Sequence, residues 1–278
     1  MSIFTRQIKN GLCLLAALVW LAACNKKDDS VYPADGGLAF YNASQLLREE
    51  VQGKGLPALV LLNANDPADT TYGVHMPDFL PSFGGGESQQ FFPRKAINVT
   101  SPPWLGYMRV RPGLQEVSFL RTDSSFIMQT TIQTSIDKNE CLLLSDSLGT
   151  YYTTEMEENS NPGLQSVQLN VLNLNPDAGP LQIKVNDADL QQLPYRSQTG
   201  FKDFVTPSSS ETFPLRIQLI RIAAGNETAG RTTINATPGH SYTLIINGYY
   251  NNAAYTDKHT GEQISMVPDF LLSVVRNK

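Results

Sequence analysis

Residues 166–186 read SVQLNVLNLNPDAGPLQIKVN and carry a clear pattern of secondary structure. Its centre, NPDAGP, is dense in residues that favour turns. On either side of this centre, apolar residues alternate with polar ones, at Val167, Leu169 and Val171 and again at Leu181, Ile183 and Val185. Alternation with a period of two places the apolar side chains on one face of a strand. The stretch therefore predicts a strand, a turn and a second strand.

The same alternation recurs along the rest of the C-terminal half. It is found at residues 213–219, 242–246 and 272–274. From residue 38 onward, no amphipathic pattern longer than about three helical turns interrupts the short alternating segments. Several short strands within about 110 residues are typical of an antiparallel sandwich with Greek-key connections. The fold class predicted for the chain is therefore all-β.

An internal comparison indicates that this pattern occurs twice. Residues 130–145 align without a gap with residues 232–247, and residues 38–43 align with residues 169–174. Few positions are identical, but the order of polar and apolar residues is kept, although short strand patterns also match by chance.

The sequence predicts two tandem immunoglobulin-like antiparallel β-sandwich domains, residues 37–157 and 164–278. The segment EMEENSNPG, residues 155–163, has the charged and then Asn-, Pro- and Gly-rich composition of a domain boundary.

The second half resembles a known family. Its segments VLNLNPDAGPLQIKVND, Val205-Thr206-Pro207 and TINATPGHSYTLIINGY are similar to a bacterial β-sandwich family of secreted and lipid-anchored proteins, known mainly as a domain of unknown function. The first half departs from this pattern, because Gln45-Leu46-Leu47 replaces the Pro-Asp turn and Ile136-Asp137 replaces Pro-Gly. The resemblance implies a sandwich fold and an extracellular setting, and it supplies no catalytic residues.

The N-terminus has the order of a secretory signal. Arg6 and Lys9 precede the apolar run LCLLAALVWLAA, which is too short to span a bilayer. The run ends in Leu-Ala-Ala-Cys, which resembles the lipobox of bacterial lipoproteins, where the cysteine is acylated. We therefore expect residues 1–23 to be a lipoprotein signal peptide, Cys24 to carry lipid and residues 24–36 to form a flexible tether. The alternative is an ordinary signal peptide that contains a cysteine by chance.

The residues after Cys24 indicate a destination. Lys26-Lys27-Asp28-Asp29 resembles the signal that sends lipoproteins of Bacteroidetes-type bacteria to the outer face of the outer membrane. A solvated linker would have a similar composition. We expect a protein anchored in outer-membrane lipid and exposed on the cell surface.

Charge and cysteine content exclude other classes. The 278 residues carry a formal net charge of -5 and no long Lys/Arg block, so a nucleic-acid partner is not expected. Of the three cysteines, Cys13 leaves with the signal and Cys24 carries lipid. Only Cys141 then remains in the folded part, as an expected buried, unreactive thiol within an apolar run.

Motifs that carry chemistry are missing from the sequence. Metalloprotease, P-loop, dinucleotide-binding and serine-hydrolase motifs are absent. His75, His240 and His259 are not at metal-ligand spacing, and Gly239-His240-Ser241 is interpreted as a tight hairpin turn. We expect no cofactor, no metal and no catalytic residues, although a pair of carboxylates brought together in space would escape this search.

Aromatic residues are the candidates for ligand binding. A long segment punctuated by glycine and proline, residues 72–104, carries Phe79, Phe83, Phe91, Phe92 and Trp104. Tyr249, Tyr250 and Tyr255 surround a second, Asn-rich turn. Aromatic faces stack on sugars or anchor protein partners. The alternative is that these rings cap the ends of the sandwiches.

These patterns favour a surface binding or adhesion protein over an enzyme. One hypothesis is capture of a glycan or host polymer for an uptake system. The alternative is a structural component of a pilus or surface assembly, and a small hydrolase is a third hypothesis.

Overall fold

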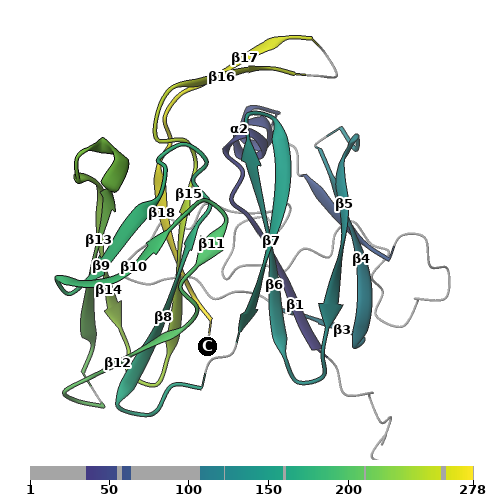
Figure 1. The fold of residues 1–278 in the computed structure, drawn as a ribbon. Helices are drawn as coiled ribbons and strands as arrows, with labels where there is room; N and C mark the ends of the chain where they lie inside the picture. The colour runs from purple at the N-terminus through teal and green to yellow at the C-terminus, as the bar shows by residue number, and fades with distance from the viewer. Residues whose placement is uncertain are drawn as a thin grey trace, which may run out of the picture.

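The computed structural model describes residues 36–54, 58–63, 107–121, 123–158, 161–209, 211–257 and 261–277. Within these ranges the chain is almost entirely β-structure, with one α-helix, α2 (Gln45–Lys54), and one 3-10 helix, η1 (Ile222–Ala224). The all-β fold class expected from the sequence is confirmed. The strands are arranged in stacked layers (Figure 1).

Two sheets form the N-terminal half. The first sheet has the strand order β2-β4-β5, and the second has the order β3-β1-β6-β7. Their strands are β1 (Gly36–Asn42), β2 (Leu59–Leu62), β3 (Met108–Val110), β4 (Gly113–Leu120), β5 (Phe126–Thr134), β6 (Asn139–Ser147) and β7 (Thr150–Glu158). Buried side chains fill the space between the two sheets, and among them Phe40 meets Phe119 edge to face at 6.2 Å.

Two further sheets form the C-terminal half. The third sheet has the order β11-β8-β15-β18, with β12 also paired to β8, and the fourth has the order β10-β9-β13-β14. Their strands are β8 (Ser166–Asn173), β9 (Leu181–Val185), β10 (Ala188–Leu193), β11 (Ser197–Gln198), β12 (Lys202–Val205), β13 (Phe213–Arg221), β14 (Glu227–Ala236), β15 (Ser241–Asn247) and β18 (Leu271–Arg276). The alternating residues that predicted β8 and β9, Leu169 and Ile183 among them, lie in the core between these sheets.

A short two-stranded sheet projects from the C-terminal half. It consists of β16 (Ala253–Thr256) and β17 (Gln263–Met266), and we call it the arm. The arm belongs to the connection between β15 and β18, but its side chains pack with Leu46 of helix α2 and Tyr151 of β7. A segment of the second half therefore covers the end of the first.

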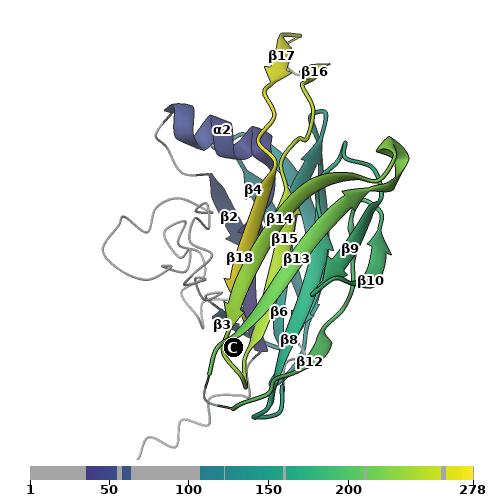
Figure 2. The same ribbon diagram turned by 90° about the vertical axis from the view of Figure 1, so that its left-hand side faces the viewer.

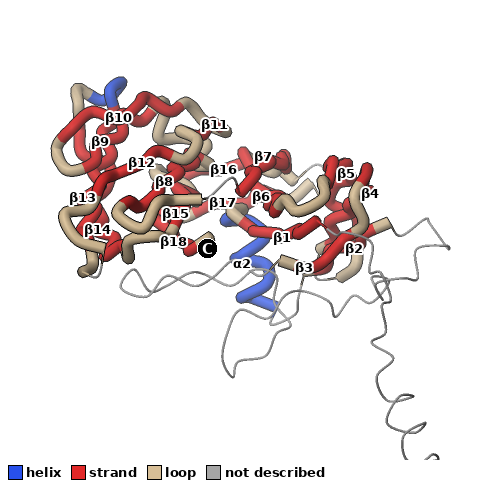
Figure 3. The backbone as a smooth tube through the Cα atoms, turned by 90° about the horizontal axis from the view of Figure 1, so that it is seen from below, coloured by secondary structure: helices blue, strands red, loops and turns tan. Residues whose placement is uncertain are grey.

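The second and third sheets pack against each other, so that the two halves share an apolar interface (Figures 1 and 3). Its buried residues are Ala39, Tyr41, Ala43, Cys141, Leu143 and Met156 from the first half and Leu172, Leu174, Ile245 and Val275 from the second. Both middle sheets are thus covered on both faces. This explains the continuous apolar runs in β6 and β15, since only a sheet with one wet face needs strict alternation.

The middle sheets are not wholly antiparallel, which corrects one part of the expected architecture. β1 pairs with β6 in parallel, and β8 pairs with β15 in parallel, whereas the other strand pairs of the described sheets are antiparallel. Parallel pairing requires a long connection between the strands. In the first half this connection includes β2, β4 and β5 of the first sheet, and in the second half it includes the strands of the fourth sheet.

Equivalent hydrogen bonds hold the two parallel pairs. Leu38 lies opposite Glu140, and Leu169 lies opposite Tyr242, which are positions that the internal alignment matches. At the ends of these pairs, Ala43 N–H donates to Leu144 C=O at 2.6 Å, and Leu174 N–H donates to Ile246 C=O at 2.7 Å. The two halves therefore share one strand register in their middle sheets. The domain boundaries at 157 and 164 stay a prediction.

The turns at residues 135–138 and 237–240 connect different sheets. β5 belongs to the first sheet and β6 to the second, while β14 belongs to the fourth and β15 to the third. The interpretation of Gly239-His240-Ser241 as a hairpin is therefore wrong, although a tight turn is present. Asp137 and Gly239 occupy matching positions and both have positive φ, 58° and 78°. Aspartate tolerates this left-handed conformation better than most residues, so the first half manages without glycine here.

Helix α2 stands where the second half has its Pro-Asp turn. Ser44 Oγ accepts a hydrogen bond from Leu47 N–H at 3.1 Å, which caps the helix N-terminus. At the matching position, Asn175 Oδ1 accepts from Ala178 N–H at 2.5 Å. The same local cap thus begins a helix in one half and a turn in the other, where Gly179 with a φ of 75° and Pro180 end it.

Different elements lie at the two ends of the molecule. β1, β6 and β8 begin at one end, which we call the tether end because the chain before Gly36 enters there. Helix α2, η1 and the arm lie at the opposite end, which we call the distal end (Figures 1 and 2). The described chain also finishes near the tether end, after β18.

Candidate functional site

The described residues include only part of the predicted site. Tyr249, Tyr250 and Tyr255 are described, whereas Cys24, Phe79, Phe83, Phe91, Phe92 and Trp104 lie outside the described residues. All three tyrosines follow β15 and lie in or before the arm, at the distal end.

Tyr249 is a buried link between the two halves. Its side chain is 1% exposed, and its hydroxyl donates to Asp146 Oδ2 at 2.7 Å. The Tyr249 hydroxyl oxygen also accepts a hydrogen bond from Leu148 N–H at 2.6 Å. A ring enclosed in this way offers no open face to a ligand. The structure therefore places Tyr249 in the junction between the halves and leaves Tyr250 and Tyr255 as the described surface candidates.

Asp146 collects donors from both halves. Ser44 donates its hydroxyl to Oδ1 at 2.5 Å, and the backbone N–H of Leu46 lies 3.4 Å from the same oxygen. Burial raises the pKa of this carboxyl, while the hydrogen bonds from Ser44 and Tyr249 act in the opposite direction. The carboxyl group is fully used in holding α2, β6 and the chain after β15 together.

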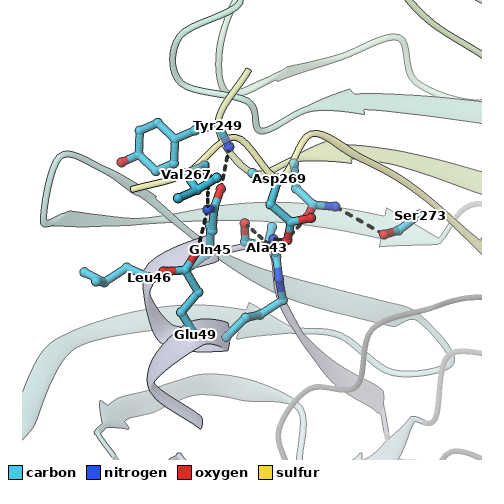
Figure 4. Close-up of polar contacts among 12 residues, drawn as sticks. Ala43, Gln45, Leu46, Glu49, Tyr249, Val267, Asp269 and Ser273 are labelled. Carbon is cyan, nitrogen blue, oxygen red and sulfur yellow. Dashed lines mark hydrogen bonds and ion pairs between the residues drawn. The ribbon is translucent and has the colours of Figure 1, made fainter. Parts of the chain in front are cut away.

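Helix α2 inserts two polar side chains into the second half, as Figure 4 shows around Gln45. Gln45 Nε2 donates to Val267 C=O at 2.7 Å, and its Oε1 accepts from Tyr249 N–H at 2.8 Å. Arg48 donates to Asn247 Oδ1 at 2.7 Å and forms an ion pair with Asp269 at 3.0 Å. These contacts fix the two strands that lead into and out of the arm.

Tyr255 lies on the arm and covers the β6–β7 turn. A Cβ atom at Gly149 would clash with the Tyr255 ring, so the ring rests directly on that glycine. Burial, and then the charges of Asp146 and Asp257, raise the pKa of Tyr255 to about 12. The Tyr255 side chain is half-buried, and its contacts serve to attach the arm to the first half.

Tyr250 and Asn251 form the most exposed described candidate. Asp177 accepts from Tyr250 N–H at 2.7 Å through Oδ1 and from Asn251 N–H at 2.8 Å through Oδ2. The Tyr250 ring is half-buried, with the Arg221 guanidinium 4.3 Å from its centroid and Phe270 edge-on at 5.3 Å. This turn is held in one conformation while the side chains of Asn251 and Asn252 remain exposed.

Sequence reasoning did not find Asp177 or Arg221. Asp177 was interpreted only as part of a turn. Its second role depends on a loop more than 70 positions later, whose backbone N–H groups donate two hydrogen bonds to the Asp177 carboxylate. Arg221 reaches the same turn from the end of β13 and also pairs with Glu227 at 3.2 Å. The polar side chain inside the NPDAGP turn was the available signal, because an aspartate there can accept from a neighbouring loop.

The cysteine and histidine residues considered in the sequence do not form a reactive or metal-binding site within the described residues. Cys141 is buried, and burial raises the pKa of its thiol, which agrees with the expected unreactive cysteine. His240 contacts Arg276 at the tether end, and His75 and His259 lie outside the described residues. Within the described ranges, no three His, Cys, Asp or Glu side chains come together to hold a metal ion. No helix in the same ranges has the length and apolarity to cross a membrane.

The comparisons with known proteins give little. No protein family model matches the chain, and no curated protein matches it. A solved structure concerning α-glucan binding by a streptococcal virulence factor is similar to 76% of this chain and 92% of its own, with 8% sequence identity and a TM-score of 0.25. At that score the likeness carries no argument about the fold or the ligand of this chain.

Proposed function

We propose that the protein is a lipid-anchored binding or adhesion protein of the cell surface, which captures a glycan or host polymer for an uptake system. The observation that carries the proposal is the position of the Tyr250–Asn251 turn at the distal end, opposite the end where β1 begins. A lipid on Cys24 would hold the tether end at the membrane. The turn would then face the medium, where a polymer is met.

The chemistry of the turn supports a carbohydrate ligand. An amide side chain donates and accepts hydrogen bonds, as sugar hydroxyl groups require, and an aromatic ring packs on the C–H face of a sugar. Asn251 and Asn252 follow Tyr250 and are exposed, and Asn251 Nδ2 uses one N–H on Asp177 Oδ2 at 3.1 Å, so its amide oxygen and second N–H are available to a ligand. Because Asp177 already fixes the backbone of the turn, little further ordering is needed when a ligand binds.

The test is binding of residues 25–278, as a soluble chain, to a broad glycan panel. We expect the double variant Tyr250→Ala, Asn251→Ala to weaken binding by about tenfold or more, as the loss of a central aromatic anchor does. Phe126→Ala is the matched control, since it removes an exposed aromatic ring from β5, in a different sheet. Trp104→Ala tests the segment 72–104 in the same assay.

Two results would contradict glycan capture. One is a panel without any ligand, and the other is a ligand whose affinity is unchanged in both the Tyr250, Asn251 double variant and Trp104→Ala. The location is tested separately. Protease added to intact cells should cleave the protein, and Cys24→Ala should release it from the membrane fraction.

A strand edge supports the second candidate, a component of a surface assembly. β14 is the last strand of the fourth sheet and pairs only with β13 among the described residues. A free edge of ten residues can accept a strand from another chain. This candidate predicts protein-only oligomers of the mature chain, and a strictly monomeric chain that co-purifies with no partner would contradict it.

The described carboxyl groups do not favour the third candidate, a hydrolase. Burial raises the pKa of both Asp146 and Glu140, as a general acid requires. The two residues lie near opposite ends of β6, about 20 Å apart by the rise of a strand, and both are buried. They therefore do not form a catalytic pair.

A further inference from the structure

Large apolar side chains are exposed at the tether end, where the proposed function gives them no role. Leu164 is 82% exposed and Val205 is 80% exposed, and both lie around the start of β8, where Val205 pairs with Ser166. Leu114 is 67% exposed at the start of β4, and Ile136 is 51% exposed in the β5–β6 turn. These four residues, which we call the apolar rim, come from both halves.

The apolar rim lies at the end of the molecule where β1 begins. Gly37 N–H donates to Lys138 C=O, and Gly36 lies against the backbone of Ser135, so β1 begins beside the turn that carries Ile136. Leu114 lies opposite Gln133, one residue before the end of β5, at the same end. β8 and β12 meet at that end of the second half, as Figures 1 and 2 show.

The length of the preceding chain limits how far this end can lie from Cys24. Residues 24–35 reach about 40 Å when fully extended. If Cys24 is acylated, as the proposed function requires, the tether end is held within that distance of a bilayer and is on average nearer to it than the distal end. Among large surfaces, a membrane is therefore the one that the apolar rim meets most often.

We infer that the apolar rim is a membrane-contact face, and that its side chains enter the interfacial region of the lipid that holds Cys24. Charged residues of both signs flank the rim, Lys138 and Lys202 against Asp137 and Asp203. Lys138 pairs with Glu157 at 2.7 Å, and Glu140 and Glu158 lie at the same end, so no basic patch selects an anionic lipid and apolar insertion carries the contact. Contact at several points from both halves sets the long axis upright and presents the Tyr250–Asn251 turn outward.

The test uses the full chain, purified from its membrane fraction and reconstituted in vesicles. Leu164→Cys and Val205→Cys are labelled in separate samples with an environment-sensitive fluorophore. Val267→Cys is the matched control, because Val267 is 69% exposed and lies at the distal end, after β17. The chain's own Cys141 is buried and stays unlabelled, and an acylated Cys24 has no free thiol.

We expect the emission of the labels at 164 and 205 to shift to shorter wavelength and to be quenched by spin-labelled lipid. The label at 267 should report water throughout. Labels at 164 and 205 that report water, in a chain that sediments with the vesicles, would overturn the inference while leaving the anchor in place. Quenching of the label at 267 by spin-labelled lipid would also overturn the inference. A chain that is labelled at Cys24 and stays in the supernatant would overturn the anchor and this inference with it. Glycan binding is measured on the soluble chain and is independent of these results.

Discussion

The hydroxyl of Tyr249 donates a 2.7 Å hydrogen bond to Asp146 Oδ2 across the junction between the two halves of the chain. Both side chains are buried, and Ser44 donates to the other oxygen of the same carboxyl. Together with the apolar interface of the middle sheets, this contact joins the two sandwiches into one body. Changes at the junction should therefore alter the stability of the whole chain.

Removing the Tyr249 hydroxyl should lower the free energy of unfolding. In Tyr249→Phe the buried Asp146 carboxyl loses a donor, which costs about 1–3 kcal/mol when a buried group loses its partner. Urea unfolding followed by circular dichroism measures the change. Tyr250→Phe is the control, since its hydroxyl bond to Glu227, at 3.3 Å, is exposed. Equal stability of the two variants would show that the Tyr249 bond adds nothing.

The raised pKa of Asp146 predicts a pH dependence of known sign. The folded chain holds this proton more tightly than the unfolded chain, whose carboxyl titrates near its usual pKa of about 4. Between that value and the raised folded pKa, unfolding releases a proton, so the free energy of unfolding falls as pH rises and then levels off. The free energy of unfolding of the wild type minus that of Asp146→Asn should therefore decline as pH rises above about 4. Urea titrations at several pH values measure this difference. A difference that grows with pH would mean that the folded pKa is lowered.

Arg48→Ala should destabilise the attachment of α2 to the second half. The change leaves the buried Asn247 without its donor and Asp269 without its ion pair, with an expected loss of about 1–3 kcal/mol, because Asp269 is partly exposed. Arg216→Ala is the matched control, since its pair with Asp187 is exposed and such pairs contribute about 0–1 kcal/mol. Denaturant titration of both variants measures the difference, and similar losses would contradict the role given to Arg48.

Gly149→Ala should loosen the arm. Gly149 has a φ of 78°, and an added Cβ would clash with the Tyr255 ring. Gly179→Ala is the matched control, because Gly179 has a φ of 75° and open space around the added atom, so it carries only the backbone strain of about 1–2 kcal/mol. Hydrogen exchange in β16 should become faster in Gly149→Ala alone. Unchanged exchange there would mean that the Tyr255 contact does not hold the arm.

The second half alone should expose an adhesive surface. A chain of residues 161–278 leaves Leu172, Leu174, Ile245 and Val275 uncovered on the outer face of the third sheet. Uncovered apolar patches of this kind promote association. We expect this fragment to bind a hydrophobic dye and to self-associate, as measured by fluorescence and size-exclusion chromatography. A monomeric fragment without dye binding would mean that the shared interface is dispensable.

Much of the fold was predictable because strands leave a local signal. The alternation at Val167, Leu169 and Val171 placed these residues correctly on one buried face, and the alignment of residues 130–145 with 232–247 matches equivalent strands. The sheet to which each strand belongs was harder to predict from the sequence. The turn at Pro238-Gly239 has the same local sequence whether its strands pair with each other or enter different sheets, so the hairpin interpretation failed.

The candidate site was predictable only in part, for a related reason. The Asn-rich turn near Tyr250 is visible in the sequence, but the exposure of each ring depends on which segments cover it. Tyr249 and Tyr250 are neighbours, yet Asp146 and α2 enclose the first while Asp177 and Arg221 leave the second at the surface. These partners lie between 29 positions (Arg221 to Tyr250) and 204 positions (Gln45 of α2 to Tyr249) away, so the sequence around the tyrosines does not reveal them.

The all-β class, the strand patterns and their repetition can be predicted from the sequence, because side-chain periodicity follows from the geometry of a single strand. The folded chain shows in addition that both middle sheets are buried on two faces and that β1 and β8 pair in parallel with β6 and β15. The folded chain also shows that the arm of the second half packs on the first half. These features depend on contacts between distant segments, whose free energy comes from burying surfaces that no single segment contains.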